Sequence, residues 1–540
     1  GLGDVYKRQA AYKAATENLG SGRPTVILAK TIKGWTLGPG FEGRNATHQI
    51  KKMTKDQLLA MRDRLQLQDE LPENAFDEAD PPYIQLGKDS IEYQYMMERR
   101  RALDGSIPKR TTVARRPLEL PADGPFAEMR AGSNGQEVST TMAFTRLLRG
   151  LARDEHIGPR VVPIIPDEAR TFGMDALFRE LNIYASQGQK YQPVDHDLLL
   201  SYSESAKGQI LEEGITEAGS MASFIAAGTS YSTRGVPMVP FYTFYSMFGF
   251  QRVGDLIWQA ADMRTRGFMM AATAGRTTLL GEGLQHQDGH SLVLASTVPF
   301  VQAYDPAFAY EVGAIVQAGM VRMYGGGPPE LTDVFYYITL YNENYEMPPM
   351  PDTPGLAEAI VEGLYKFADA PAGPSIPATI LFSGTAHTAA REAVAELAEH
   401  YDVAAELWSA TSYKALREDG MAAERWNRLH PSQEPRTPRV TEILEGSRGP
   451  ITAVSDFMAI VPEQVQRFLP GRTFVPLGTD GMGRSDTREA LRRFFEIDTG
   501  HVVVAVLSSL LTDGKVDAAT VQDAIARYDI DPDAIDPYVV

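Results

Sequence analysis

Short apolar runs alternate with amphipathic segments along most of the chain. Runs rich in Val, Ile, Phe and Ala are typical of buried strands, and apolar residues spaced three and four apart are typical of helices that cover a sheet. The expected strands lie at residues 25–29, 160–166, 236–241, 268–272, 300–304, 378–382, 403–407 and 449–454, and a further apolar run lies at 502–507. The expected helices lie at residues 54–65, 208–227, 387–399 and 486–495. This alternation predicts an α/β protein with mainly parallel sheets flanked by helices.

The pattern is interrupted between residues 67 and 121, where the chain is polar, rich in charge and dotted with proline. Such a stretch is typical of a connection between domains. A second, proline-rich interruption follows residue 348. The sequence therefore predicts an amino-terminal part at 1–66, a connecting segment at 67–121, and two α/β domains at 122–348 and 349–540.

Composition and charge narrow the classes of function. The chain has 540 residues, with 52 basic and 70 acidic side chains, so its formal charge is −18. An acidic chain without a long basic stripe is a poor binder of nucleic acid. No apolar run approaches the ~20 residues of a membrane helix. Cysteine is absent, which excludes disulfides, thiolate metal sites and a cysteine nucleophile. We expect a cytoplasmic protein with no nucleic-acid or membrane partner.

Several common catalytic signatures are missing from the sequence. It contains no G-x-x-x-x-G-K-[ST] phosphate loop, no H-E-x-x-H zinc helix and no G-x-S-x-G elbow. One G-x-G-x-x-G string lies at residues 38–43, but it sits well past the expected strand 25–29 and opens no apolar helix. These features count against NTP hydrolysis, zinc proteolysis, a nicotinamide dehydrogenase and serine hydrolysis.

Two adjacent carboxylates, Asp167 and Glu168, directly follow the expected strand at 160–166. The carboxyl ends of parallel strands are where the sites of α/β proteins collect. There the pair could bind a cation, hold a polar ligand, or act as acid and base. The alternative interpretation is a cap at the amino terminus of a helix.

Glu217 stands among Ile215, Met221 and Phe224 in a segment that otherwise has the composition of a core helix. A carboxylate in apolar surroundings has a raised pKa unless it is paired, and it is suited to accept or share a proton near neutral pH. The alternative is a glutamate on the helix surface. Surface exposure is our expectation for the neighbouring Glu212 and Glu213.

Three further clusters carry candidate chemistry. The first ten of residues 241–252 (FYTFYSMFGFQR) include six aromatics, which could form a stacking wall for a flat ring or a plain core. The glycine-flanked residues 281–290 hold two histidines, which could shuttle protons, ligate a metal together with Asp288, or simply surround a capping Asp288. The glycine-rich loop with Lys33 and His48 could close over a site or remain a plain surface loop.

Taken in order, these motifs resemble one family, the homodimeric first component of the bacterial pyruvate dehydrogenase complex. The resemblance runs from about residue 25 to the end and rests on motifs at residues 32–34, 42–49, 167–173, 208–215, 231–233, 245–252, 281–286, 340–345 and 478–486. The family implies a thiamine-diphosphate-dependent enzyme with a transketolase-like subunit. By this resemblance, residues 1–66 are the remnant of its first, diphosphate-binding domain. Residues 122–348 are its middle, pyrimidine-binding domain, and residues 349–540 its transketolase-like carboxy-terminal domain, which is implied in dimer contacts.

The resemblance implies five residues that touch the cofactor. Glu217 matches the glutamate that bonds N1′ of the aminopyrimidine, and it also has a catalytic role. Phe248 matches the aromatic residue that stacks on this ring, and Ile215 matches a backbone contact to it. Asp195 matches a further polar support, and Lys33 a polar contact at the edge of the site.

Five further residues match catalytic groups of the family. Tyr245, His286 and His48 match groups that hydrogen-bond the reaction intermediates. Asp167 and Glu168 match carboxylates that line the site near the thiazolium ring. The glycine-rich loop that carries His48 matches a mobile loop that becomes ordered over the site.

The implied activity is oxidative decarboxylation of pyruvate, with reductive acetylation of the lipoyl group of the dihydrolipoyl acetyltransferase component. The family's first domain holds Mg²⁺ and the diphosphate through a Gly-Asp-Gly motif, which does not occur in this sequence. The chain also begins without methionine, and residues 1–9 look like a translated adapter. We therefore expect an inactive fragment whose metal site lies in an absent amino-terminal domain. The alternatives are the first component of another 2-oxo-acid dehydrogenase and a non-catalytic dimerisation fragment.

Overall fold

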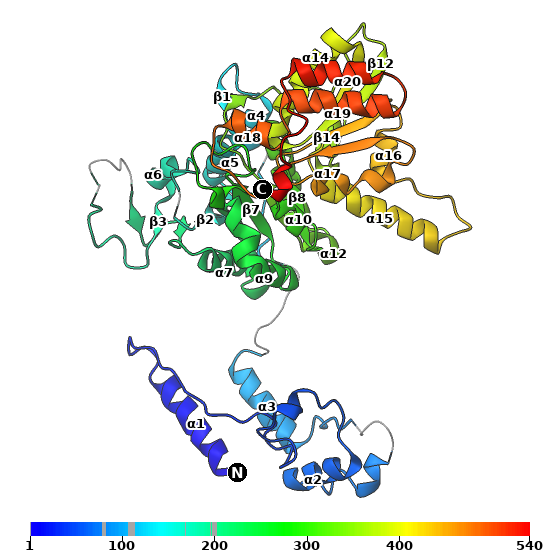
Figure 1. The fold of residues 1–540 in the computed structure, drawn as a ribbon. Helices are drawn as coiled ribbons and strands as arrows, with labels where there is room; N and C mark the ends of the chain where they lie inside the picture. Colours follow the sequence, from blue (N-terminus) through cyan, green and yellow to red (C-terminus); the bar gives the residue numbers. More distant parts are fainter. Residues whose placement is uncertain are drawn as a thin grey trace. The chain divides into compact units, whose positions relative to one another are not determined.

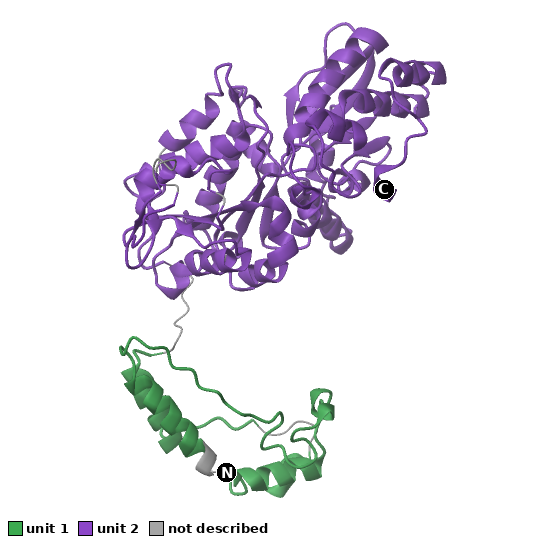
Figure 2. Ribbon diagram, turned by 60° about the vertical axis from the view of Figure 1, so that its left-hand side comes forward, with its two compact units in different colours: residues 1–107 green, residues 108–540 purple. Residues whose placement is uncertain are grey.

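A computed structural model describes residues 2–77, 83–105, 114–121, 123–167, 169–194, 196 and 202–540. The chain divides into two compact units, Gly1–Ile107 and Pro108–Val540, coloured green and purple in Figure 2. The candidate site residues fall in both units.

The described part of the first unit contains helices joined by long irregular segments. They are α1 (Leu2–Glu17), α2 (Lys55–Leu65) and α3 (Ile91–Ala102). Thr54 and Gln57 form a reciprocal capping box at the start of α2, which confirms the helix expected at 54–65. Helix α3 was not expected, because its segment is dominated by charged and polar residues.

The strand expected at residues 25–29 is wrong. The run is irregular, and its apolar side chains are exposed, Val26 to 79% and Leu28 to 92%. A strand requires a neighbour to pair its amide and carbonyl groups. Within the described residues of the first unit no strand forms, so the β-branched composition of this run finds no sheet to join.

A six-stranded sheet forms the centre of the second unit, and all its strand pairs are parallel. Its order is β5-β2-β6-β7-β9-β8. The strands are β2 (Val161–Ile165), β5 (Leu211–Glu212), β6 (Val239–Tyr245), β7 (Gly267–Ala272), β8 (Val301–Tyr304) and β9 (Phe335–Thr339). Strands β2, β7 and β9 are buried along their whole length, as expected of a parallel sheet that is covered on both faces.

Helices cover both faces of this sheet (Figure 1). Phe268 and Met270 of β7 enter the core cluster that includes α5 (Thr140–Arg153) and α11 (Ala309–Tyr324). Met269, between them, enters the cluster on the opposite face with residues of two other helices. Those helices are α7 (Glu217–Gly228) and α9 (Gly249–Asp262).

A second sheet lies in the carboxy-terminal part of this unit, with the order β11-β13-β12-β14-β15. Its pairs are parallel except for the edge strand β11. The strands are β11 (Tyr365–Ala368), β12 (Ile376–Phe382), β13 (Val403–Ser409), β14 (Ile451–Val454) and β15 (Phe474–Leu477). The flanking helices are α14 (His387–Tyr401), α15 (Tyr413–Leu429), α16 (Arg439–Ile443), α17 (Ile460–Glu463), α18 (Arg488–Phe494), α19 (Thr499–Thr512) and α20 (Ala518–Arg527). The predicted α/β architecture with mainly parallel sheets is therefore confirmed.

Short elements complete the second unit. The helices are α4 (Gly124–Arg130), α6 (Phe178–Leu181), α8 (Ser230–Thr233), α10 (Ser291–Ala295), α12 (Pro329–Thr332) and α13 (Leu356–Glu362). Two small strand pairs are β1 (Glu137–Val138) with β10 (Tyr345–Glu346), and β3 (Ile183–Tyr184) with β4 (Glu204–Ser205).

Several expected boundaries move. The helix expected at 208–227 begins only at Glu217, because Thr216 is extended and its side chain caps Gly219 at 3.2 Å. The residues before it form the edge strand β5 and a loop. The strand expected at 236–241 starts later and continues to Tyr245. The apolar run at 502–507 lies inside helix α19.

One segment, Arg488–Thr512, has the length and apolar composition of a helix that could cross a membrane, and 56% of its apolar window is buried inside the structure. It consists of two helices, α18 and α19, separated by a short irregular stretch. Val502 and Leu507 of α19 are fully buried in the core. The apolar character of this segment is therefore explained by core packing.

Both core clusters extend through both sheets, so the second unit has continuous apolar layers. A buried carboxylate also connects its two parts. Glu311 in α11 accepts four hydrogen bonds, from the amides of Ala307 (2.5 Å) and Phe308 (3.1 Å), and from the hydroxyls of Tyr365 (2.6 Å) and Ser409 (2.7 Å). Burial raises the pKa of Glu311, and the four donors oppose that rise. This residue caps α11 and joins it to β11 and β13.

We expect Glu311→Ala to lower the free energy of unfolding by about 4 kcal/mol, because two amides and two hydroxyls would lose a buried acceptor. The midpoint of urea unfolding, followed by near-UV circular dichroism on the whole chain, measures the effect. Glu358→Ala is the matched control, since Glu358 is an exposed acid in the first turn of α13. Equal midpoints for the two variants would contradict the role given to Glu311.

Candidate active site

A wall of aromatic rings and one histidine stands at the carboxyl end of β6. Tyr245 ends that strand and stacks on His286, with ring centroids 5.0 Å apart and planes inclined by 12°. Phe248 meets both rings edge-on, at 5.8 Å from Tyr245 and 5.4 Å from His286. Phe172 supports Tyr245 from another side at 5.5 Å. The sequence-predicted Tyr245, Phe248 and His286 are thus brought together.

The interpretation of the aromatic cluster as core is confirmed for most of its rings, and the stacking wall for a flat ring stays a prediction. Four of its six aromatics are buried in the core, namely Phe241, Tyr242, Phe244 and Phe250. Tyr245 and Phe248 are half-buried and form the wall. The burial of the aromatics within β6 follows from the strand periodicity, because successive residues point to opposite faces of the sheet and helices cover both faces.

Glu217 is the first residue of α7, and only 10% of its side chain is exposed. Arg252 of α9 donates to both of its oxygens from Nη1, at 2.9 and 3.1 Å. The same guanidinium lies 3.8 Å from the centroid of the Phe248 ring. Glu217 is therefore neither a plain surface glutamate nor an unpaired buried acid. One cation links it to the aromatic wall.

His286 is held by a neighbour on its own loop. Its Nδ1 lies 2.8 Å from Oε2 of Glu282, four residues earlier. A carboxylate at this distance accepts the proton of Nδ1, which leaves Nε2 as the acceptor of the neutral ring. The pair therefore fixes both the tautomer and the orientation of the imidazole.

Asp288 is fully buried and serves as a cap. Its carboxylate accepts the amides of His290 (3.0 Å) and Ser291 (2.9 Å), and also the hydroxyl of Ser246. Across the described residues, no group of three or more His, Asp or Glu side chains is arranged to hold a metal ion. The capping interpretation of Asp288 is confirmed.

Asp167 follows β2 and is exposed. It lies close enough to Glu212 on the neighbouring edge strand for its charge to affect that residue. Burial, and next the charge of Asp167, raise the pKa of Glu212 to about 7. The expectation that Glu212 and Glu213 are ordinary surface residues is wrong, because both are half-buried and Glu213 accepts the hydroxyl of Ser223.

Two predicted site residues, Glu168 and Asp195, lie outside the described residues. Ile215 stands in the turn before α7 and is 79% exposed. Lys33 and His48 belong to the first unit, where Nζ of Lys33 lies 2.8 Å from Nδ1 of His48. Their arrangement concerns that unit alone.

The glycine-rich loop of the first unit is tied to helix α2. Oε1 of Glu42 accepts the amide of Thr36 at 3.0 Å and Nη1 of Arg64 at 2.7 Å. The loop ends in a short 3₁₀ turn, η1 (Asn45–His48). It therefore has a defined path within the first unit.

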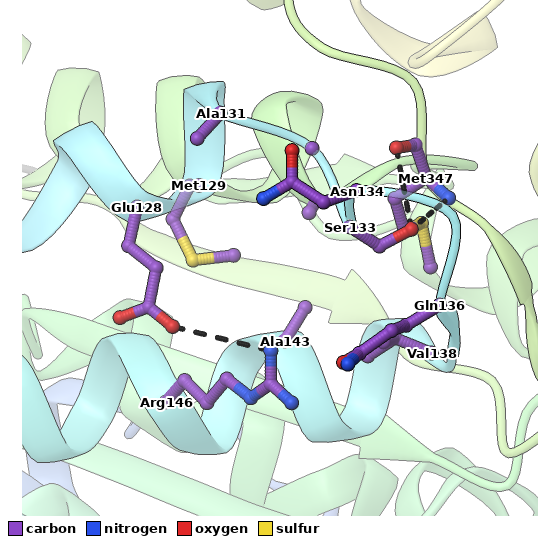
Figure 3. Close-up of a pocket in the computed structure, with 12 residues that line it drawn as sticks. Glu128, Met129, Ala131, Ser133, Asn134, Gln136, Val138, Ala143, Arg146 and Met347 are labelled. Carbon is purple, nitrogen blue, oxygen red and sulfur yellow. Dashed lines mark hydrogen bonds and ion pairs between the residues drawn. The ribbon is translucent and has the colours of Figure 1, made fainter.

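A separate cavity of about 220 Å³ lies between α4, α5 and the segment that joins them (Figure 3). Met129, Val138 and Ala143 form its apolar wall, and Asn134 and Arg146 stand at its polar side. None of the sequence-predicted site residues lines it. The candidate active site is therefore defined by the side chains at the aromatic wall and not by this cavity.

Together, these groups suit a flat, nitrogen-containing ring and a small polar substrate. A ring can stack on Phe248 while one of its nitrogens shares a hydrogen with Glu217. The Nε2 atom of His286 can accept a hydrogen bond from a hydroxyl of a second molecule, and the hydroxyl of Tyr245 can donate to one of its oxygens. The site can thus hold a ring cofactor and exchange protons near it.

Arg252 and Glu282 were given no role from the sequence, although their spacing carried a signal. Each stands four residues from its partner, Arg252 after Phe248 and Glu282 before His286. Such spacing brings side chains together on one turn of a helix, as it does for Arg252 in α9. Glu282 lies in an irregular stretch, so its contact with His286 depends on the path of the loop.

Two family models match the chain. The model described as the pyruvate dehydrogenase E1 component middle domain matches residues 118–348. The model described as the transketolase-like TK C-terminal domain matches residues 363–498. The aromatic wall and Glu217 lie within the first match.

The chain is similar to pyruvate dehydrogenase E1 components from several bacteria. It is 52% identical over 531 residues to that of Mycolicibacterium smegmatis, covering 98% of this chain and 56% of the relative. It is 52% identical over 537 residues to that of Mycobacterium tuberculosis, covering 99% and 57%. It is 45% identical over 534 residues to that of Escherichia coli K12, covering 99% and 58%. The chain thus spans little more than half the length of these relatives.

Solved structures of transketolases resemble the fold. The transketolase of Campylobacter jejuni aligns with a TM-score of 0.55 and 16% identity, covering 92% of this chain and 65% of that structure. The transketolase of Leishmania mexicana aligns with a TM-score of 0.53 and 15% identity, covering 87% and 57%. At such low identity the likeness concerns the fold alone, and it confirms the expected transketolase-like fold.

We expect Glu212 to make stability depend on pH. Because its folded-state pKa is raised to about 7, the folded chain binds this proton more tightly than the unfolded chain. The contribution of this proton to the free energy of unfolding is complete at acid pH, and it is lost as the pH rises through about 7. Glu212→Gln does not titrate. Its stability relative to the wild type should therefore rise by about 1 kcal/mol between about pH 5 and about pH 8, a value reduced for partial exposure.

Urea midpoints at the two pH values measure this difference. Glu358→Gln, at an exposed position, serves as the control for a change of acid to amide. If the difference in stability between Glu212→Gln and the wild type stays constant with pH, the raised pKa of Glu212 is refuted.

Proposed function

Because the chain belongs to the family of pyruvate dehydrogenase E1 components, we propose that it supplies the middle and carboxy-terminal parts of an enzyme that decarboxylates pyruvate oxidatively. The acetyl group formed would be transferred to the lipoyl group of a dihydrolipoyl acetyltransferase component. The observation that carries the proposal is the joint placement of Glu217 and the Phe248 ring on one guanidinium, beside a histidine of fixed tautomer.

The proposed cofactor is thiamine diphosphate, and the described residues fit its aminopyrimidine ring. Phe248 offers an aromatic surface, and Glu217 offers a carboxylate that is mostly shielded from water. The turn that carries Ile215 would add backbone contacts. When bound, this cofactor supplies a nucleophilic carbon and an electron sink for the loss of CO₂.

The residues of the chain orient the reactants and handle protons. Arg252 holds the carboxylate of Glu217 next to Phe248 through charge-assisted hydrogen bonds. Glu217 would share a hydrogen bond with N1′ of the pyrimidine. Nε2 of His286 would accept a proton from a hydroxyl that forms at the reacting oxygen, while Glu282 keeps its ring in place. The hydroxyl of Tyr245 would donate to the ketone oxygen of pyruvate.

We propose that Mg²⁺ and the diphosphate are held by residues outside this sequence. The sequence contains no Gly-Asp-Gly motif, and the chain covers 56–58% of the three relatives described above. Lys33 is proposed as a polar contact of the cofactor, and His48 as a hydrogen-bonding partner of the reactants. Asp167 and Glu168 would line it near the reacting carbon, and Asp195 would give further polar support.

The complete protein is proposed to be a cytoplasmic homodimer that works with the acetyltransferase component. Exposed apolar side chains on the second unit suit a subunit contact. Trp258 of α9 is 54% exposed, and Met263, just after that helix, is 41% exposed. Both lie on the same helix as Arg252 or directly after it, so such a contact would lie close to the site.

An acetyl-transfer assay tests the proposed function. We expect the full-length protein, with thiamine diphosphate, Mg²⁺ and the acetyltransferase component, to form acetyl-CoA from pyruvate. Glu217→Ala should lower kcat at least about 100-fold, because a proton-transfer group is lost. Glu358→Ala is the control.

Failure of the wild-type protein with all components saturating would refute the function. A clear preference for another 2-oxo acid would favour the alternative dehydrogenase. Dimerisation without turnover would favour the non-catalytic alternative. Near wild-type activity of Glu217→Ala would refute the role of this residue.

A calorimetric titration of the chain itself tests where the diphosphate is held. We expect no binding of thiamine diphosphate with Mg²⁺ up to about millimolar concentration, because the aminopyrimidine contacts alone give weak affinity. Micromolar binding would place the diphosphate site on this chain and contradict the proposal.

A further inference from the structure

Residues 273–290, which we call the histidine loop, carry His286 from the end of β7 to α10. The root of this loop is bound by the carboxy-terminal part of the second unit. Asp456, which follows β14, accepts the amide of Arg276 at 3.2 Å and the amide of Thr277 at 3.1 Å. Asp456 is only 1% exposed. Two successive amides of the loop are therefore fixed by one buried carboxylate.

Further contacts hold the loop on both sides of His286. Nε of Arg488 donates to the carbonyl of Thr278 at 2.8 Å. The amide of Arg484 donates to Oε1 of Gln287 at 2.6 Å. Beyond His286, the amide of Met458 donates to the carbonyl of Gly289 at 2.8 Å. The guanidinium of Arg276 also reaches the carbonyl of Thr479.

The loop and the carboxy-terminal part also approach each other closely at two glycines. Gly275 has φ +85°, and a Cβ there would lie 2.2 Å from Oδ2 of Asp456. A Cβ on Gly483 would lie 2.9 Å from the carbonyl oxygen of Leu284. Both approaches require glycine. The loop therefore rests directly on the carboxy-terminal backbone and on Asp456.

The position of this loop sets the position of the imidazole. His286 binds Glu282 of the same loop and stacks on Tyr245, which belongs to β6. The ring can keep its place on Tyr245 only while the loop keeps its path. Anchors at residues 276–278 and at 287–289 bracket His286 on both sides.

We propose that the carboxy-terminal part, through Asp456, is a positioning element of the active site that fixes the histidine loop. Asp456 does not touch the substrate, so it acts through His286. The inference rests on the proposed function only in assigning His286 to the substrate. It adds a catalytic task to a part of the chain that the sequence resemblance assigns to dimer contacts.

The chemistry of Asp456 supports a geometric role. Oδ1 of Asp456 accepts both amides, while Oδ2 lies 3.3 Å from the amide of Thr277 and accepts the hydroxyl of Thr385 at 3.4 Å. An asparagine would keep one acceptor oxygen and would turn its NH₂ group toward one of these sets of donors. Burial raises the pKa of Asp456 to about 7, and Arg492 opposes that rise. The other charged or titratable groups facing it are Arg276 and Tyr341. A buried acid in this place is costly unless it maintains such contacts.

Hydrogen exchange on the whole chain tests the anchoring directly. In Asp456→Asn and in Arg488→Gln, the amides of residues 275–290 should exchange about ten times faster than in the wild type. Asp498→Asn is the matched control. That aspartate caps α19 through the amide of His501 and pairs with Arg493 of α18, so the variant should change exchange in these two helices and leave residues 275–290 unchanged. Unchanged exchange of the loop in both test variants would overturn the proposal, whatever the function.

Kinetics of the full-length protein test the consequence for catalysis. Asp456→Asn should lower kcat about tenfold while the affinity for thiamine diphosphate stays within about threefold, because Glu217 and Phe248 lie outside the loop. If Asp456→Asn does not fold, Arg488→Gln carries the same test.

His286→Ala distinguishes a failure of the positioning inference from a failure of the role given to His286 in the proposed function. Suppose that His286→Ala is impaired, and that Asp456→Asn or Arg488→Gln is folded and shows faster exchange in the loop. If that loop variant keeps the kcat of the wild type, the positioning inference fails. If His286→Ala retains full activity, the role of His286 in the proposed function fails. Parallel losses of kcat in His286→Ala and in the loop variants, with normal cofactor affinity and faster loop exchange, would support the proposal.

Discussion

Burial of the six-stranded parallel sheet on both faces is the constraint on which the arrangement of the site depends. Side chains along β2, β7 and β9 are committed to the core, so polar groups can emerge only where strands end. Tyr245 ends β6, the histidine loop leaves β7, and Asp167 follows β2. Glu217 joins them from the start of α7, where helix capping by Thr216 fixes the first turn. The site is thus a product of sheet topology and helix capping.

Buried carboxylates hold the two sheets of the second unit in one geometry. Glu311 joins α11 to β11 and β13, and Asp456 joins β14 to the root of the histidine loop. Apolar contact alone is tolerant of small shifts, whereas a buried acid requires all its donors in place. The core clusters supply the stability of the unit, and these acids fix the positions of its helices, strands and loops relative to one another.

The sequence predicted those features that depend on neighbouring residues. Strands such as β7, the capped helix α2 and the family motifs around Glu217 and His286 were all found. Prediction from the sequence failed for features that depend on residues far away along the chain. Residues 25–29 have strand composition but no strand to pair with, and Glu212 is perturbed by burial and by Asp167 on a neighbouring segment. Asp456 lies 180 positions from Arg276, so no local pattern could have linked them.

That separation along the chain also orders the events of biosynthesis. Ribosomes add about 5–20 residues per second. Asp456 therefore leaves the ribosome roughly 9–36 s after Arg276, a delay obtained from their separation of 180 positions. During this interval the six-stranded sheet can form, because its last strand, β9, ends at Thr339. The nascent chain thus carries His286 on an unanchored loop during this interval, and the loop can acquire its anchored path only after Asp456 has been made.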